Sequence, residues 1–190
     1  MSPPHWEFFL SIEADLAQCT RYVEFCPENY KTFSVEFARV IVAASAEFDA
    51  VAKGLCRAID GNAKPESITE YQSIIVGKYP RFPEYKIHIP RFKLEFRPWI
   101  EWTQSNSPDW WSKGYNKIKH HRDQHFASAN LHNAILATAG LLTGIVYLYD
   151  ATLGAFPQVD LAAAPKLFEP QDEPGEMQPA TISWNCRAWK

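Results

Sequence analysis

Apolar residues recur every three or four positions along the first sixty residues, the spacing of one face of an α-helix. In residues 6 to 26 this stripe consists of Phe9, Ile12, Leu16, Cys19, Val23 and Cys26. Pro27 predicts the end of that helix, because proline removes a backbone donor. A second stripe predicts a helix from about residue 30 to residue 59, followed by Asp60-Gly61-Asn62 as a stop signal. Two long helices joined by a short turn predict an antiparallel helical hairpin.

The pattern changes character in the middle of the chain. The segment PESITEYQSIIVGKY, residues 65–79, has the length of two or three helical turns. Apolar and polar residues then alternate in YKIHI and KLEFRPW, on either side of Pro90-Arg91. This alternation predicts a small hairpin, or two extended pieces, as an insertion at about 80–100.

Two further helices are predicted after this insertion. In SNSPDWW, Ser107 can act as N-cap with Pro108 as the first helical residue, so a third long helix should begin there. A break is expected at residues 122 to 128. A strongly apolar helix should then run from about residue 129 to residue 149, with one face formed by Leu131, Ile135, Thr138, Leu142, Ile145 and Tyr149.

These elements predict an all-α fold, an antiparallel bundle of four to five helices over residues 1–150. Residues 151–190 hold five of the fourteen prolines and the acidic stretch EPQDEPGE. That composition predicts an extended C-terminal tail, which either wraps the domain or binds a partner. The small residues Ala137, Ala139 and Gly140 would leave room for close helix packing, and we expect a symmetric homodimer.

Composition narrows the classes of function. Nineteen Lys and Arg against 22 Asp and Glu give a net charge of −3, so nucleic acid would have to be recognised by a local patch. The apolar run at 134–149 is shorter than the roughly 20 residues that span a bilayer, which favours a buried helix. The first residues lack the features of a secretory signal, and we expect a cytoplasmic protein with no membrane partner and free thiols.

One basic cluster stands out, YNKIKHHRDQHF at residues 115–126. Trp111, Tyr115 and Ile118 fix the buried face of its helix by their spacing. Four polar residues then project from neighbouring parts of one surface near the helix C-terminus: Asn116, Lys119, His120 and Arg122. Cations at this end also complement the helix dipole without any function, so a purely structural role is one interpretation.

The mixture of residue types supports a second interpretation. Arg122 offers a planar fork that matches a phosphate, Lys119 adds a point charge, and Asn116 can orient a base or ribose hydroxyl. His120 can move protons near neutral pH. Together these groups suit metal-independent RNA cleavage, whereas phosphate binding needs only the cations. His125 is a further phosphate-facing or RNA-binding candidate, although it falls in the predicted break.

No metal or cofactor is expected. The acidic residues Glu36, Glu47 and Asp49 are typical of a solvated helix face, and no second Glu-x-x-His pattern accompanies them. The His121 to His125 spacing lacks the intervening Glu of a zinc protease, and no phosphate-cradling glycine loop occurs.

The segment PDWWSKGYNKIKHHRDQHFASANLHNAILATAGLL leads from the cluster into the apolar helix. This arrangement resembles the HEPN superfamily of bacterial helical-bundle proteins, particularly its branches with a YNxxKHxR motif. The strongest correspondence covers residues 108–149. The resemblance implies a four- to five-helix bundle that dimerises through its motif-bearing helices. Many members are metal-independent ribonucleases of toxin–antitoxin, phage-defence or RNA-processing systems, and others are non-catalytic modules.

The chain departs from the best-known catalytic pattern of that superfamily, in which an Arg is often followed by a polar residue, here Asp123, and then four to six residues later by a His. Here residues 127–129 are Ala, Ser and Ala, so His125 comes too early and His132 too late. The resemblance therefore implies His120 and Arg122 as catalytic or phosphate-facing residues, supported by Asn116 and Lys119. Two hypotheses follow. The first is an RNA-directed ribonuclease, whose partners would be RNA and an antitoxin or other operon partner. The second is a non-catalytic module that binds nucleotide or protein.

Overall fold

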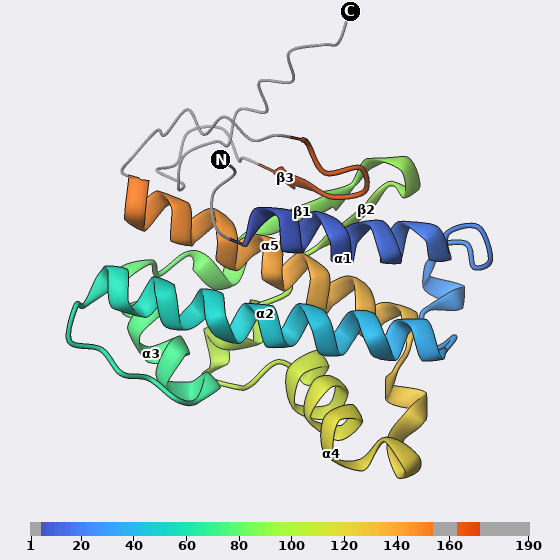
Figure 1. The fold of residues 1–190 in the computed structure, drawn as a ribbon, viewed down its shortest axis with the longest axis horizontal. Coiled ribbons are helices and arrows are strands. Elements are labelled where there is room, and N and C mark those ends of the chain that lie inside the picture. Colours follow the sequence, from blue (N-terminus) through green and yellow to red (C-terminus); the bar gives the residue numbers. More distant parts are fainter. Residues whose placement is uncertain (1–4, 154–162, 172–190) are drawn as a thin grey trace, which may run out of the picture.

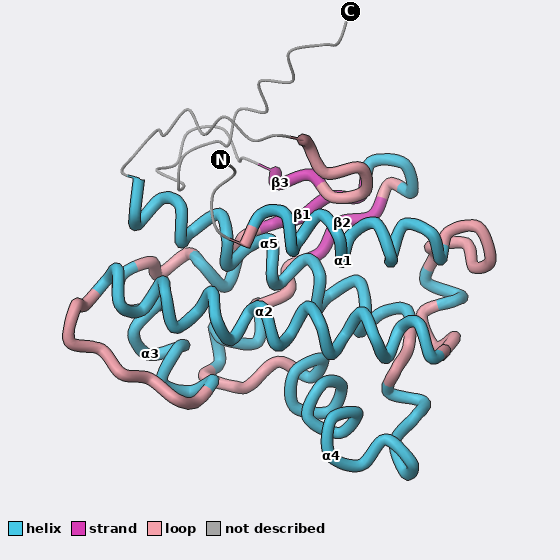
Figure 2. Tube along the Cα trace, viewed as in Figure 1, coloured by secondary structure: helices cyan, strands magenta, loops and turns pink. Residues whose placement is uncertain are grey.

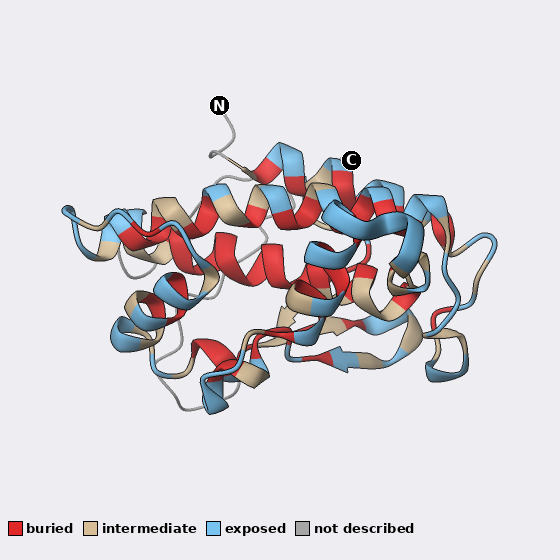
Figure 3. Cartoon of the chain, turned by 90° about the horizontal axis from the view of Figure 1, so that it is seen from below, coloured by how far each residue is buried: buried red, intermediate tan, exposed pale blue. Residues whose placement is uncertain are grey.

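Helix α5, Leu131–Leu153, lies at the centre of the molecule, with most of its residues buried (Figure 3). It packs along α2, Val35–Ile59, and α1, Trp6–Cys19, lies against both (Figure 1). Two shorter helices, α3, Ile68–Lys78, and α4, Asn116–His125, lie on the side of α2 away from α1. The computed structural model describes residues 5–153 and 163–171, and within them the chain is mostly helical, as the sequence predicts.

A small antiparallel sheet covers the side of the molecule opposite α4 (Figure 2). Strand β1, Lys86–Ile89, pairs with β2, Leu94–Phe96, which confirms the expected hairpin at 80–100. Ile87 and Ile89 alternate inward and are fully buried. The third strand, β3, Glu169–Gln171, pairs with the other edge of β1.

Two helix ends differ from the sequence prediction. Helix α1 ends at Cys19 instead of residue 26, because the chain tightens into i→i+3 turns so that Phe25 can bury its ring against Phe92. Helix α2 begins at Val35 instead of about residue 30. Ser34 caps it by accepting the N–H of Phe37. Backbone hydrogen bonds join residues 30–34 to the start of α5. The N–H of Ser34, for example, donates to the carbonyl of Ala129.

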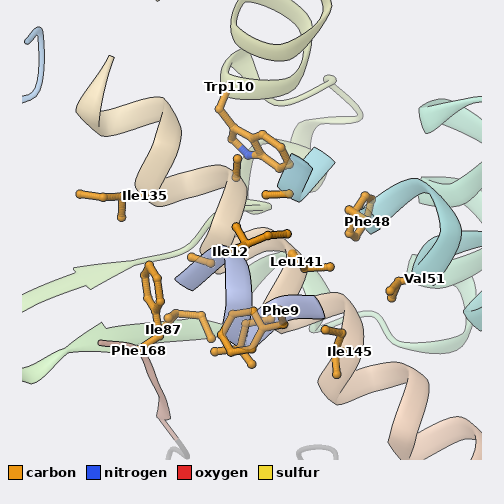
Figure 4. Close-up of a cluster of buried hydrophobic side chains, with 14 of the residues drawn as sticks. Phe9, Ile12, Phe48, Val51, Ile87, Trp110, Ile135, Leu141, Ile145 and Phe168 are labelled. Atoms are coloured by element: carbon orange, nitrogen blue, oxygen red, sulfur yellow. The ribbon is translucent and has the colours of Figure 1, made fainter. Parts of the chain in front are cut away.

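The core is built from side chains of α1, α2, α5 and the sheet that converge on one centre (Figure 4). Close approach between helices depends on glycines of α5. A Cβ at Gly144 would lie 2.9 Å from the Phe48 ring, and a Cβ at Gly140 would lie 2.9 Å from the Trp110 ring. Ala137, Ala139 and Gly140 are therefore part of this chain's own core, and the close packing that the sequence predicts at these small residues lies within one chain.

Part of the predicted tail belongs to the folded unit. The buried carboxylate of Glu13 accepts the backbone N–H groups of Lys166, Leu167 and Phe168 at 2.8–3.0 Å. The indole N–H of Trp6 donates to the carbonyl of Ala163. These contacts hold residues 163–171 against α1 and deliver β3 to the sheet. The rest of the predicted tail, beyond the end of α5, lies outside the described residues.

Helix α5 is long and apolar enough to cross a membrane by composition alone, over Leu131–Thr152. However, 83% of its most apolar window is buried inside the fold, so its apolar residues already have protein neighbours. This burial agrees with the prediction of a core helix and is compatible with a soluble protein.

We predict that Gly144→Ala destabilises the fold by about 1–3 kcal/mol, because the added methyl overlaps the Phe48 ring in a packed core. Urea unfolding followed by circular dichroism measures the change. Gly77→Ala is the matched control, since its added Cβ would meet no described atom within 4 Å beyond the backbone of its own helix and its chain neighbours, and alanine favours helix. Equal stability of the two variants would contradict the packing described for α2 and α5.

We predict that Glu13→Gln lowers the free energy of unfolding by about 1–3 kcal/mol, because one of two acceptor oxygens becomes a donor facing backbone N–H groups. Hydrogen exchange should speed up at the amides of residues 166–168 and much less in α2. Asp15→Asn serves as control because Asp15 is exposed on the same helix. Unchanged protection of residues 166–168 would show that Glu13 does not hold the segment.

Candidate functional site

The basic cluster is positioned by the π-helical turn Trp110–Tyr115 that precedes α4. Its aromatic side chains are buried. Trp110 packs edge-on against Trp99 and Trp111 packs edge-on against Phe48. The indole N–H of Trp110 donates to the carbonyl of Pro98 at 2.7 Å. These anchors fix where α4 leaves the core and which side it exposes.

The start of this segment differs from the sequence prediction. Ser107 does not act as the N-cap, since its buried hydroxyl has no hydrogen-bond partner in the described structure. The carboxylate of Glu101 instead accepts the backbone N–H of Asp109 at 2.8 Å. Gly114 allows the turn to approach α5, because a Cβ there would lie 3.2 Å from the amide nitrogen of Asn133.

The predicted break in the motif helix occurs one residue earlier than expected. His121 has φ −142° and ψ 42°, which is not helical, and a 3₁₀ turn follows at Phe126–Ser128. The straight-helix relation between His120 and Arg122 is therefore lost. Both residues nevertheless line the groove described next.

An open groove of about 860 Å³ lies between the beginning of α2 and the cluster on α4. We call it the α2–α4 groove. Its α2 side is formed by Val35, Ala38 and Val42. Its other side consists of Ile118, Lys119, His120, Arg122, Asp123 and Phe126. Three of the five predicted site residues, Lys119, His120 and Arg122, thus face one hollow.

The other two predicted residues lie elsewhere. Asn116 lines a second hollow of about 480 Å³, which also contains Lys119, Asp49 and Glu66. Lys119 borders both hollows. His125 is half-buried beyond the break, with its ring 6.4 Å from that of His121, and it is not among the described residues that line either hollow.

The cations of the groove are exposed and available to a ligand. In the described part of the chain, no carboxylate forms a salt bridge with Lys119 or Arg122, whereas Lys113 pairs with Asp109 at 2.8 Å. The ammonium of Lys119 lies 5.4 Å from the centre of the Tyr115 ring, which orients it without neutralising it. Asp123 is the one carboxylate among the described residues of the lining.

His132 does not face the motif. Its ring stacks on Tyr30 with centroids 4.6 Å apart and lines a different hollow, beside Phe96 and Asn133. Burial lowers the pKa of His132, because the charged imidazolium would lose its water. His132 therefore has a packing role, because its ring helps to hold residues 30–34 against the start of α5.

Sequence reasoning missed the apolar side of the groove. In this lining, Val35 is 60% exposed and Val42 is 37% exposed. Phe33, which is 51% exposed, lies just outside the groove and contacts Phe126 of its lining. The signal was present in the sequence, because Val35 and Val42 are seven residues apart and lie off the buried stripe of α2.

Comparison of the chain with protein-family models, with curated proteins and with solved structures gives no significant match. The geometry of the groove is therefore the basis for the functional proposals that follow.

Proposed function

We propose that this chain is an RNA-directed protein of the HEPN-like kind, a metal-independent endoribonuclease that works through the α2–α4 groove. The observation that supports this proposal is the shared placement of Lys119, His120 and Arg122 in one open groove, without a carboxylate partner for either cation among the described residues. A phosphodiester has the charge and size that such a groove can hold.

The chemistry needs few groups. The ribose 2′-hydroxyl attacks the adjacent phosphorus, the new O–P bond forms, and the bond to the 5′-oxygen breaks. His120 takes the proton from the attacking hydroxyl or gives one to the departing 5′-oxygen. Arg122 and Lys119 stabilise the charge that develops on the phosphoryl oxygens. The products are a 2′,3′-cyclic phosphate and a 5′-hydroxyl.

Proton uptake and proton release need two groups, and the described lining of one chain holds a single imidazole. We therefore include the homodimer in the proposal, so that two antiparallel bundles would place two copies of the cluster beside one substrate. A cytoplasmic role in toxin–antitoxin or phage-defence systems, with an antitoxin or other operon partner, accompanies this proposal through the resemblance alone.

The single imidazole also favours a second candidate. The same groove can act as a non-catalytic module that binds RNA or a nucleotide phosphate. Residues 127–129, where active members of the superfamily carry their histidine, are Ala, Ser and Ala at the end of the 3₁₀ turn Phe126–Ser128, and they supply no acid or base. In this reading Lys119 and Arg122 bind the phosphate and His120 donates a hydrogen bond.

Incubation with end-labelled RNA in EDTA tests the proposal. The wild-type protein should cleave, His120→Ala should slow cleavage by about 10²–10⁴-fold, and Arg122→Ala by about 10²-fold or more. Lys117→Ala is the matched control, an exposed lysine on the same helix that is not among the described lining residues. Binding that depends on Arg122 without any cleavage would support the module. Absence of binding by the wild-type protein would contradict both candidates.

A further inference from the structure

The α2 side of the groove has a chemistry that phosphate binding does not require. Val35, Ala38 and Val42 lie at i, i+3 and i+7 and form a continuous apolar strip on one face of α2. RNA bases stack on flat aromatic rings, for which branched aliphatic side chains are poor partners. These three aliphatic side chains therefore favour an apolar side chain of a partner over an RNA base, whereas the ring of Phe126 on the opposite side can contact either ligand.

Exposed apolar side chains concentrate at this place. Six large hydrophobic residues are exposed in the described structure, and Val35 and Val42 line the groove while Phe33 adjoins it. The edge-to-face contact of Phe33 with Phe126, at 5.5 Å between ring centres, joins this exposed ring to the lining of the groove. Concentration of apolar surface beside polar residues marks an interaction site.

Charge distinguishes the partner. The opposite side of the groove carries Lys119 and Arg122 against the single carboxylate of Asp123. A ligand that fits both sides has an apolar stripe next to acidic residues, which is the surface of an acidic amphipathic helix. A second copy docked directly on this groove would bring two basic clusters together without neutralising them, whereas the homodimer of the proposed function holds an RNA strand between its two clusters.

The dimensions agree with helix-in-groove recognition. Val35 and Val42 are separated by seven residues, about 10 Å along the axis of α2, which is two helical turns. A partner helix that carries apolar anchors at i, i+3 or i+4, and i+7 covers the same length.

We propose that the α2–α4 groove is a docking site for an acidic amphipathic helix of another protein. Because this helix would cover Lys119, His120 and Arg122, its binding excludes RNA, and in this respect the inference rests on the proposed function. The same groove would thus recognise the partner helix and allow that helix to inhibit RNA binding.

A labelled helical peptide of about 15 residues tests this proposal, with leucines at i, i+4 and i+7 and glutamates along the flanks. Fluorescence anisotropy with the full chain measures its affinity. A second peptide of identical composition, with the leucines shuffled off one face, reports charge attraction alone. The acidic amphipathic peptide should bind at least about tenfold more tightly than the shuffled one and should displace bound RNA.

Substitution in the groove separates the two ligands. Val42→Ser should weaken peptide binding by about tenfold, since it removes apolar contact, and should change RNA affinity by less than about twofold. Arg122→Ala should weaken both. Ile100→Ser is the matched control, because Ile100 is a similarly exposed residue, at 39%, outside this groove.

Four other outcomes would overturn the docking proposal, and a fifth would overturn only the proposed function. Equal affinity for both peptides, or no effect of Val42→Ser, shows that no helix docks on the strip. An equal loss of RNA affinity in Val42→Ser assigns the strip to RNA. Conversion of a dimer to monomers by Val42→Ser, seen by light scattering, assigns it to a second copy. Tighter binding of a peptide of residues 172–190 assigns it to the chain's own C-terminus. Peptide binding without RNA binding refutes the proposed function and leaves the docking site in place.

Discussion

The contact between Gly140 and the rings of Trp99 and Trp110 is the constraint on which the arrangement of the cluster depends. With no side chain at residue 140, the two indoles lie directly against α5, and Trp99 donates its N–H to the carbonyl of Gly140 at 3.2 Å. Trp110 begins the π-helical turn that continues into α4. Packing in the centre of the molecule thereby decides which residues of α4 face α2 and which face water.

The polar chemistry of the groove follows from this packing. Tyr115 and Ile118 hold α4 to the core by their buried side chains, so the residues between and beyond them are left at the surface. Lys119 and Arg122 come to lie opposite an apolar strip of α2, where the described structure offers no carboxylate salt bridge. Elsewhere on the surface, lysines such as Lys53 and Lys113 pair with aspartates one turn away. Other exposed cations of the described chain, such as Lys117, also form no salt bridge, and Lys119 and Arg122 are distinguished from them by lining one groove together.

Local patterns predicted the parts of the fold that local forces determine. The stripe of α2 and the alternation of β1 were readable because each buries one face of a regular element. The start of α2, the role of Glu13 and the return of residues 163–171 were not readable. Glu13 bonds backbone groups more than 150 residues away, and a single carboxylate in a helical pattern carries no trace of such a partner. The sequence also predicted one surface that includes Asn116 and Arg122 by assuming a straight helix, whereas the non-helical backbone of His121 redirects the residues after it.

The central claim is that Lys119 and Arg122 meet the phosphates of one RNA strand in the α2–α4 groove. The salt dependence of affinity for single-stranded RNA tests it most directly, because each neutralised phosphate contributes about 0.7 to the slope of log K against log salt. Lys119→Ala and Arg122→Ala should each lower the magnitude of that slope by about 0.7, and Lys117→Ala should leave it unchanged. Equal slopes in all three variants and the wild-type protein would show that no phosphate is bound at this groove.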